Sequence, residues 1–411
     1  MVSAQIAEDT ELLARVRKAM EEIRSGRMVI LVDDEDRENE GDLTLAADMV
    51  TPEAINFMVT HGRGLICLAL SEDQVDRLRL PMMHAPGHGG PPLGTAFTVS
   101  IEARYGVTTG ISASDRAQTI RVASRPDARP EDLLTPGHVF PLRAKKGGVL
   151  VRAGQTEGAV DLARVAGMNP AGVICEVMND DGTMARMPDL ERFAKRHNMM
   201  ILSIADLIQY RTQTERLVRS LSSGPLPLDE TRSVWTAHVY ESVVDQARFL
   251  ALVKGRPDLT QEPVLCRVHR GSVLSDVFSS AASEAGRDLR MALRHIERAG
   301  CGVVLYVLSQ GDILWEFEAY RARSQQTETL DSRSADVLEE DEGLESAVGS
   351  HRGPRRDDGP LREFGLGAQI LTDLGVRKII VLTDNPRRIV GIAGYGIEVV
   401  DTMPLHDTVS T

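Results

Sequence analysis

Residues 28–47 read MVILVDDEDRENEGDLTLAA, and the fold of the first half of the chain follows from this stretch. The apolar run from Met28 to Val32 predicts a buried strand, and the apolar pattern resumes at Leu43 to Ala47. Seven of the ten residues between them, 33–42, are acidic. A solvated turn explains a bare run of charge. At the end of a buried strand, however, so many carboxylates repel one another, and a divalent cation held by oxygen ligands would relieve the repulsion.

The flanking sequence predicts a mixed α+β domain over residues 1–210. Residues 10–25 carry apolar side chains at three- and four-residue spacing, which is typical of an amphipathic helix. Short β-like runs and helical patterns then alternate along the chain. We expect strands at 64–70, 95–101, 148–152 and 172–178, and helices at 52–60, 112–119, 157–166 and 188–197.

A second mixed α/β domain is expected over residues 234–411, after a polar linker at 211–233. Its clearest elements are a helix from about 275 to 299, a strand at 302–308 and a second strand from Lys378 to Leu382. Residues 321–360 hold 10 acidic, 6 basic and only 8 apolar residues, so we expect this insertion to be disordered.

The composition limits the classes of function. The 411 residues include 47 basic and 60 acidic ones, and the net charge of −13 argues against nucleic acid as the main partner. The four cysteines form no C-x-x-C pair, so no cysteine zinc site is expected. The sequence shows neither a signal peptide nor an apolar run of about 20 residues, which predicts a cytoplasmic protein without a membrane span.

A second candidate group lies within residues 135–156, which contain TPGHVFPL and GGVLVRAGQTE. Residues 152–156 open a predicted helix, where backbone N–H groups with Arg152 and Thr156 would suit a phosphate. An ordinary capped turn is the alternative. His138 is either a general acid or base or a hydrogen-bonded structural residue.

The third group is GVICEVMNDDGTMAR, residues 172–186. Glu176 interrupts a strand that otherwise has a buried pattern, and a buried carboxylate is costly unless a partner or a reaction needs it. The segment from Asp180 to Thr183 is typical of a hairpin turn.

Together these groups resemble the 3,4-dihydroxy-2-butanone 4-phosphate synthase family of riboflavin biosynthesis, over nearly all of residues 10–210. The resemblance implies a lyase that converts ribulose 5-phosphate to the four-carbon ketone phosphate, releasing C4 as formate, with one or two Mg²⁺ or Mn²⁺ ions per site. It also implies a multilayer α/β/α fold and a homodimer with sites near the subunit interface. The matching stretches are DDEDRENEGD (33–42), TTGISASDRA (108–117), TPGHVFPL (135–142), RAGQTEGAVDLARVAG (152–167) and GVICEVMNDDGTMARMPDL (172–190).

Residue roles follow from the same resemblance. Glu38 is expected to bind the metal, and His138 and Glu176 to act as the essential acid and base. The expected substrate contacts are Arg37, Glu38, Asp42, Arg152, Ala153, Gly154, Gln155, Thr156 and Glu176, and Asp33, Glu35 and Glu40 complete the acidic loop.

One position departs from the family pattern. Many members carry a histidine, the second metal ligand, where this chain has Gln155. The amide oxygen of Gln155 is a ligand that Mg²⁺ accepts, so we expect binding with an altered metal preference.

The second domain resembles GTP cyclohydrolase II, at RVHRGSVLSDVF (267–278) and in LREFGLGAQILTDLGVRKII within residues 361–402. That family holds zinc with three cysteines, and the matching residues here are Ser272, Ser283 and Ala285. Its motif QEGRGIGL is reduced to SQGDIL at 309–314. We expect a degenerate domain without zinc or cyclohydrolase activity, serving oligomerisation, stability or regulation. The alternatives are a bifunctional enzyme with another metal arrangement and a non-catalytic scaffold of the flavin pathway.

Overall fold

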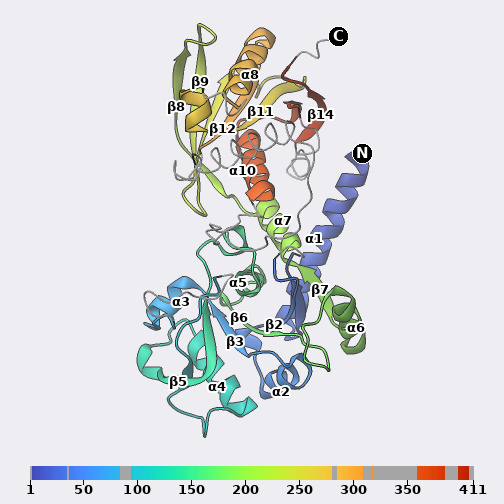
Figure 1. Cartoon of the computed structure of the whole chain (residues 1–411), viewed down its shortest axis with the longest axis vertical. Helices are drawn as coiled ribbons and strands as arrows, with labels where there is room; N and C mark the ends of the chain where they lie inside the picture. Colours follow the sequence, from blue (N-terminus) through green and yellow to red (C-terminus); the bar gives the residue numbers. More distant parts are fainter. Residues whose placement is uncertain are drawn as a thin grey trace, which may run out of the picture. The chain divides into compact units, whose positions relative to one another are not determined.

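The computed structural model describes residues 2–34, 37–83, 94–279, 285–308, 317, 359–384 and 397–406. Side chains are described throughout these ranges except at 2–10 and 359–364. The chain forms two compact units, one ending at Glu215 and the other beginning at Arg216. Each unit contains a mixed α/β arrangement around one sheet, which confirms the predicted fold class (Figure 1).

The first unit is built on a seven-stranded sheet in the order β4-β5-β3-β6-β2-β1-β7. The pairs β1–β7 and β3–β5 are parallel and the other pairs are antiparallel. Its strands are β1 (Val29–Val32), β2 (Gly41–Ala46), β3 (Cys67–Leu70), β4 (Ile101–Ala103), β5 (Leu133–Arg143), β6 (Ala171–Glu176) and β7 (Met200–Ser203).

Helices cover both faces of this sheet. The α-helices are α1 (Val2–Arg24), α2 (Pro52–Phe57), α3 (Glu72–Arg77), α4 (Ala113–Ser124), α5 (Gln155–Val165), α6 (Met187–His197) and α7 (Ile204–Thr214). On one face Leu68 and Val173 belong to a core shared with α2, α4 and α6. On the other face Cys67 and Ile174 pack with Ala159 of α5. Because side chains alternate along a strand, neighbouring residues enter different cores, which produces the expected α/β/α layers.

Two predicted strands of the first unit are wrong. In place of 95–101 the structure has isolated bridges at Phe97 and Thr98, and the strand β4 begins only at Ile101. The second is 148–152. Its central residues form the short 3₁₀ helix η4 (Gly148–Leu150). Gly147 and Gly148 have φ of 94° and 64°, values that glycine adopts without strain. The N–H of Val149 donates to Asp161 Oδ2 at 2.7 Å, so a side-chain carboxylate takes the place of a strand partner. Val149 and Leu150 of this segment are buried, but in a turn, and Val151 is exposed.

The second unit has its own seven-stranded sheet in the order β14-β13-β11-β12-β10-β9-β8. Trp235, Leu252 and Val304 from the sheet pack with Ala292 and Ile296 of helix α8. Its elements are β8 (Val218–Leu228), β9 (Ser233–Ser242), β10 (Arg248–Lys254), β11 (Val264–Arg270), η5 (Val273–Val277), α8 (Ala285–Ala299), β12 (Gly302–Val307), α10 (Gly359–Asp373), β13 (Lys378–Leu382) and β14 (Glu398–Met403).

The predicted linker at 211–233 is wrong as well. Helix α7 continues to Thr214, and β8 pairs along its whole length with β9. Pro225 and Pro227 are tolerated because β8 is the edge strand of the sheet. The expected disordered insertion at 321–360 lies outside the described residues, except that α10 already begins at Gly359. None of the helices described here has the length and apolar character needed to cross a membrane.

Candidate active site

The acidic loop between β1 and β2 is organised around the carboxylate of Asp33. This side chain is fully buried and accepts the backbone N–H groups of Glu38 at 3.2 Å and Glu40 at 3.0 Å. It also accepts a hydrogen bond from Arg37 Nη1 at 2.6 Å. The buried carboxylate of Asp33 therefore fixes the backbone conformation of the loop. Glu35, which was expected to belong to the same loop, lies outside the described residues.

Arg37 brings Glu38 and Gln155 together from positions 117 residues apart in the sequence. Its Nη2 donates to Glu38 Oε1 and its Nη1 to Gln155 Oε1, both at 3.0 Å. Gln155 is the first residue of α5 and is buried. Arg37 thus holds the carboxylate of Glu38 and the amide oxygen of Gln155 near each other. Both are hard oxygen ligands, which Mg²⁺ and Mn²⁺ prefer.

Asp42 and Glu176 face each other across β2 and β6. Burial raises the pKa of Asp42 well above its ordinary value, and the negative charges of Glu176, Glu38 and Glu40 raise it further. Burial and the charge of Glu38 also raise the pKa of Glu40. The rise in both pKa values is the mark of carboxylates that repel one another in a confined space. A divalent cation would lower this electrostatic cost, so the raised pKa values are compatible with a cation near these carboxylates.

The carboxylate of Glu176 is anchored from one side. Its Oε2 accepts the backbone N–H of Leu65 at 2.8 Å. A Cβ placed on Gly64 would lie 2.4 Å from the same oxygen, so the absence of a side chain there makes room for Glu176.

The N-terminus of α5 is the segment that the sequence predicted to bind a phosphate. Gly154 is the N-cap residue, and Ala153 and Thr156 beside it are buried. A Cβ placed on Gly154 would lie 2.5 Å from Arg152 Nη1 and 3.0 Å from Arg37 Nη2, so both guanidinium groups lie against this glycine. Backbone N–H groups at a helix start with guanidinium groups beside them suit a phosphate. In this structure Arg152 Nη1 pairs with Glu157 Oε2 at 2.7 Å, and Arg37 pairs with Asp33 and Glu38.

His138 lies apart from this cluster within one chain. It is on β5, and β3 separates β5 from β6, which carries Glu176. At the usual strand spacing, the backbones of His138 and Glu176 are about 10 Å apart. His138 Nδ1 instead lies 2.6 Å from Glu102 Oε2. The expected acid and base therefore share the sheet but do not touch each other.

Two residues of the site were missed in the sequence. Arg186 Nη1 donates to the backbone oxygen of Glu38 at 2.6 Å and also to that of Asn39, which has a positive φ of 53°. Glu102 is the partner of His138 on β4. The signal that identified Glu176, a carboxylate inside a buried strand, would also have identified Glu102. No comparable local signal marks Arg186.

The expected zinc positions of the second unit have other roles. Ser272 Oγ accepts the N–H of Ser275 at 3.1 Å and caps η5, and Ala285 begins α8. The third position, Ser283, and residues 309–314 lie outside the described part of the chain. Cys266 is buried in β11 and Cys301 follows α8; neither belongs to a metal-type cluster among the described residues.

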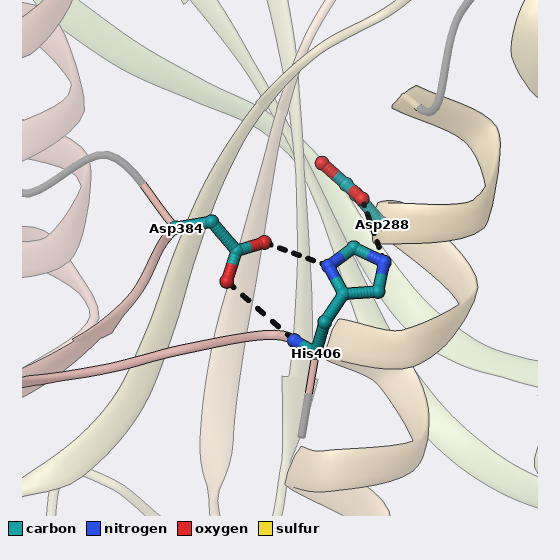
Figure 2. A group of neighbouring side chains, drawn as sticks. All are labelled: Asp288, Asp384 and His406. Carbon is teal, nitrogen blue, oxygen red and sulfur yellow. Dashed lines mark hydrogen bonds and ion pairs between the residues drawn. The ribbon is translucent and has the colours of Figure 1, made fainter. Parts of the chain in front are cut away.

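A different cluster, Asp288, Asp384 and His406, lies in the second unit, with its possible ligand atoms within 4.8 Å of one another. Figure 2 shows the imidazole of His406 between the two carboxylates. His406 Nδ1 lies 2.8 Å from Asp384 Oδ2, and Nε2 lies 3.6 Å from Asp288 Oδ1. Arg267 Nη2 is 3.5 Å from Asp288 Oδ2, so a cation already faces this carboxylate. The cluster attaches the segment after β14 to α8.

Comparisons with known proteins agree with two separate domains. Residues 17–210 match the family described as 3,4-dihydroxy-2-butanone 4-phosphate synthase, and residues 223–404 match GTP cyclohydrolase II. The riboflavin biosynthesis protein RibBA of Aquifex aeolicus is 48% identical over 396 residues, covering 95% of this chain and 92% of that protein. A crystal structure of RibBX, a two-domain 3,4-dihydroxy-2-butanone 4-phosphate synthase from A. baumannii, superposes with a TM-score of 0.71 at 36% identity, covering 95% of this chain and 98% of that chain.

Two plant relatives carry contrasting names. The bifunctional riboflavin biosynthesis protein RIBA 1 of Arabidopsis thaliana is 42% identical and the alignment covers 95% of this chain and 68% of that protein. The monofunctional riboflavin biosynthesis protein RIBA 2 of the same plant is also 42% identical, over 97% of this chain and 78% of that protein. Overall similarity therefore does not decide how many activities a two-domain chain has, and the residues of each domain must.

Proposed function

The chain belongs to the family of riboflavin biosynthesis proteins that join a 3,4-dihydroxy-2-butanone 4-phosphate synthase domain to a GTP cyclohydrolase II domain, and we propose that only its first domain is catalytic. In this proposal the first domain is a lyase that converts D-ribulose 5-phosphate to 3,4-dihydroxy-2-butanone 4-phosphate and formate. The net charge of −13 supports a small-molecule substrate rather than nucleic acid, and four free cysteines support a cytoplasmic location.

The position of Arg37 is the observation that carries the proposal. This guanidinium contacts Glu38 and Gln155, which are cation-type ligands, and it also lies against Gly154 at the anion-binding helix start. The residues that would bind a metal ion therefore lie next to the helix start that would bind a phosphate. A sugar phosphate that reacts beside a metal needs both groups in one site.

The chain's residues divide the work as follows. Arg152, Thr156 and the N–H groups at the start of α5 bind the phosphate. Glu38 and Gln155 would hold Mg²⁺ or Mn²⁺, which would supply polarisation of the substrate carbonyl and so acidify the adjacent C–H. Glu176, held by the N–H of Leu65, is placed to accept that proton.

Asp42 and His138 complete the acid and base groups. Asp42 faces Glu176, and its raised pKa suits a carboxyl that exchanges a proton with substrate hydroxyls. His138 acts as the second acid and base, with its partly exposed ring available to substrate. The active form in this proposal is the homodimer, and isolated monomers lack activity.

Purified full-length protein incubated with ribulose 5-phosphate and Mg²⁺ or Mn²⁺ tests the first activity. We expect formate and the four-carbon ketone phosphate in equal amounts, and none of either in excess chelator. Failure to release formate with either metal would favour the scaffold alternative.

For the second domain, the engaged Oγ of Ser272 and the methyl side chain of Ala285 support loss of the zinc site. We expect no consumption of GTP by zinc-supplemented protein when GTP is the only substrate. Turnover of GTP would instead establish the bifunctional alternative. GTP binding without turnover would leave the lyase proposal intact and indicate a regulatory second domain.

Exchange of Gln155 tests its place in the cation site. In Gln155→Ala we expect the metal concentration for half-maximal formate release to rise at least about tenfold, because one oxygen donor is lost. Gln155→His, which keeps a ligand atom at this position, is the matched variant and should remain active with a changed Mg²⁺ to Mn²⁺ preference. An unchanged metal requirement in Gln155→Ala would remove Gln155 from the site.

A further inference from the structure

The carboxylate of Glu102 contacts Nδ1 of the His138 ring. Its Oε2 lies 2.6 Å from His138 Nδ1, on the neighbouring antiparallel strand. The Glu102 side chain is only 12% exposed, whereas that of His138 is 43% exposed. The carboxylate is therefore on the buried side of the imidazole, and the ring is reachable from solvent.

The carboxylate of Glu102 is held by α4 and by the loop before it. Thr119 Oγ1 lies 3.5 Å from Glu102 Oε1. Gly110 has a φ of 88°, and a Cβ placed on it would lie 2.1 Å from Glu102 Oε2, so this carboxylate rests on the glycine backbone.

The loop itself is fixed by Asp115 at the start of α4. This carboxylate accepts Thr108 Oγ1 at 2.7 Å and the N–H of Gly110 at 3.0 Å, and Ser112 Oγ caps the helix through the N–H of Asp115. Residues 108–117, TTGISASDRA, were singled out in the sequence but make none of the cation or phosphate contacts described above. Their arrangement places Gly110 next to the carboxylate of Glu102, at a position where a side chain would clash with it.

We propose that Glu102 is the positioning residue of His138, holding the proton on Nδ1 so that Nε2 is the atom that exchanges protons with substrate. A carboxylate can only accept from Nδ1–H, and this contact leaves the lone pair of the neutral ring on Nε2. The same carboxylate stabilises the imidazolium after Nε2 takes a proton. The inference rests on the proposed lyase activity and deepens it by naming the working atom.

Glu102→Gln is the direct kinetic test. The amide keeps the shape of the carboxylate but can donate to Nδ1, which favours the tautomer with the proton on Nε2. In the aspartate–histidine pair of serine proteases, the corresponding exchange lowers kcat by about 10⁴-fold. We expect kcat for formate release to fall about 10²- to 10⁴-fold, with KM and the metal requirement changed less than about threefold. Glu102→Asp retains the charge and should recover at least about tenfold of the loss.

Glu72→Gln is the matched control for that experiment. Glu72 pairs with Arg143 at the other end of β5, at 2.8 Å, so the same chemical change removes a carboxylate contact to the same strand. We expect kcat within about twofold of the unaltered protein. A Glu102→Gln variant with an unchanged kcat, while the unaltered protein releases formate, would overturn the inference.

Nitrogen-15 NMR of the histidine side chains supplies a readout that does not depend on turnover. Assigned by its loss in His138→Asn, the His138 signal should show the Nδ1–H tautomer in the unaltered protein and a shift toward Nε2–H in Glu102→Gln. An Nε2–H tautomer in the unaltered protein would contradict the inference even if formate is released. Absence of formate with the expected tautomer would count against the lyase proposal alone.

Discussion

Glu38→Gln is expected to lower formate release by at least about 10³-fold, a loss of about 4 kcal/mol of transition-state stabilisation. The amide can still accept the hydrogen bond that Arg37 Nη2 donates to Glu38, so the loop keeps its geometry. The exchange removes the negative charge of Glu38, the expected metal ligand. Metal binding is therefore weakened, and with it the polarisation of the substrate, which contributes several kcal/mol. The measurement is kcat/KM for ribulose 5-phosphate over a range of Mg²⁺ concentrations.

Asp34→Asn is the matched control for Glu38→Gln. Asp34 belongs to the same acidic loop, is exposed, and accepts the N–H groups of Arg37 and Asn39 through its backbone oxygen, which the exchange leaves in place. We expect kcat/KM within about twofold of the unaltered protein. If Glu38→Gln keeps more than a tenth of the activity, Glu38 is not the metal carboxylate.

Asp42→Asn is expected to abolish most activity and, in chelator, to stabilise the protein. The Asp42 carboxylate is 5% exposed and faces Glu176 across the two strands. Replacing it with a neutral amide removes the cost of a buried charge, which we place at about 1–3 kcal/mol at neutral pH. Activity should fall at least about 10²-fold, because an acid or base contributes that much.

The sign of the pH dependence follows from the pKa of Asp42. Burial, followed by the charge of Glu176, raises this pKa in the folded state, so the folded protein holds the proton more firmly than the unfolded chain. The contribution of Asp42 to stability is therefore full below the unfolded pKa of about 3.9 and is lost as the pH rises through the folded pKa.

Urea unfolding in chelator at several pH values measures this difference. Asp42→Asn and the unaltered protein should have similar free energies of unfolding in acid, and the variant should become the more stable one toward neutral pH. Added Mg²⁺ should narrow the gap, because a bound cation stabilises only the carboxylate form. A variant that is less stable than the unaltered protein at neutral pH without metal would contradict the electrostatic account.

Hydrophobic patterning predicted most of the fold, and its errors have local causes. The strand β1, the acidic loop and β2 follow from two apolar runs around a charged decade. The segment 148–152 was mistaken for a strand because its partner is the buried carboxylate of Asp161, twelve residues away, and no local pattern shows such a partner. The stretch that includes β8 was mistaken for a linker because an edge strand with polar side chains and prolines has the composition of one.

The sequence identified residues of the candidate site, but not the contacts between them. Its motifs identified Glu38, Asp42 and Glu176, but the bridging role of Arg37 depends on a loop and a helix start that are distant in sequence. The separation of His138 from Glu176 follows from strand order, which single-strand patterns do not contain.

Ribulose 5-phosphate labelled with carbon-13 at C4 tests the central claim most directly. With full-length protein and Mg²⁺, carbon-13 NMR should show the label entering formate, while the four-carbon ketone phosphate carries none; in Glu38→Gln no labelled formate should form. Label retained in the phosphate product, or formate that forms equally in Glu38→Gln, would contradict the assignment of this site as a metal-dependent lyase.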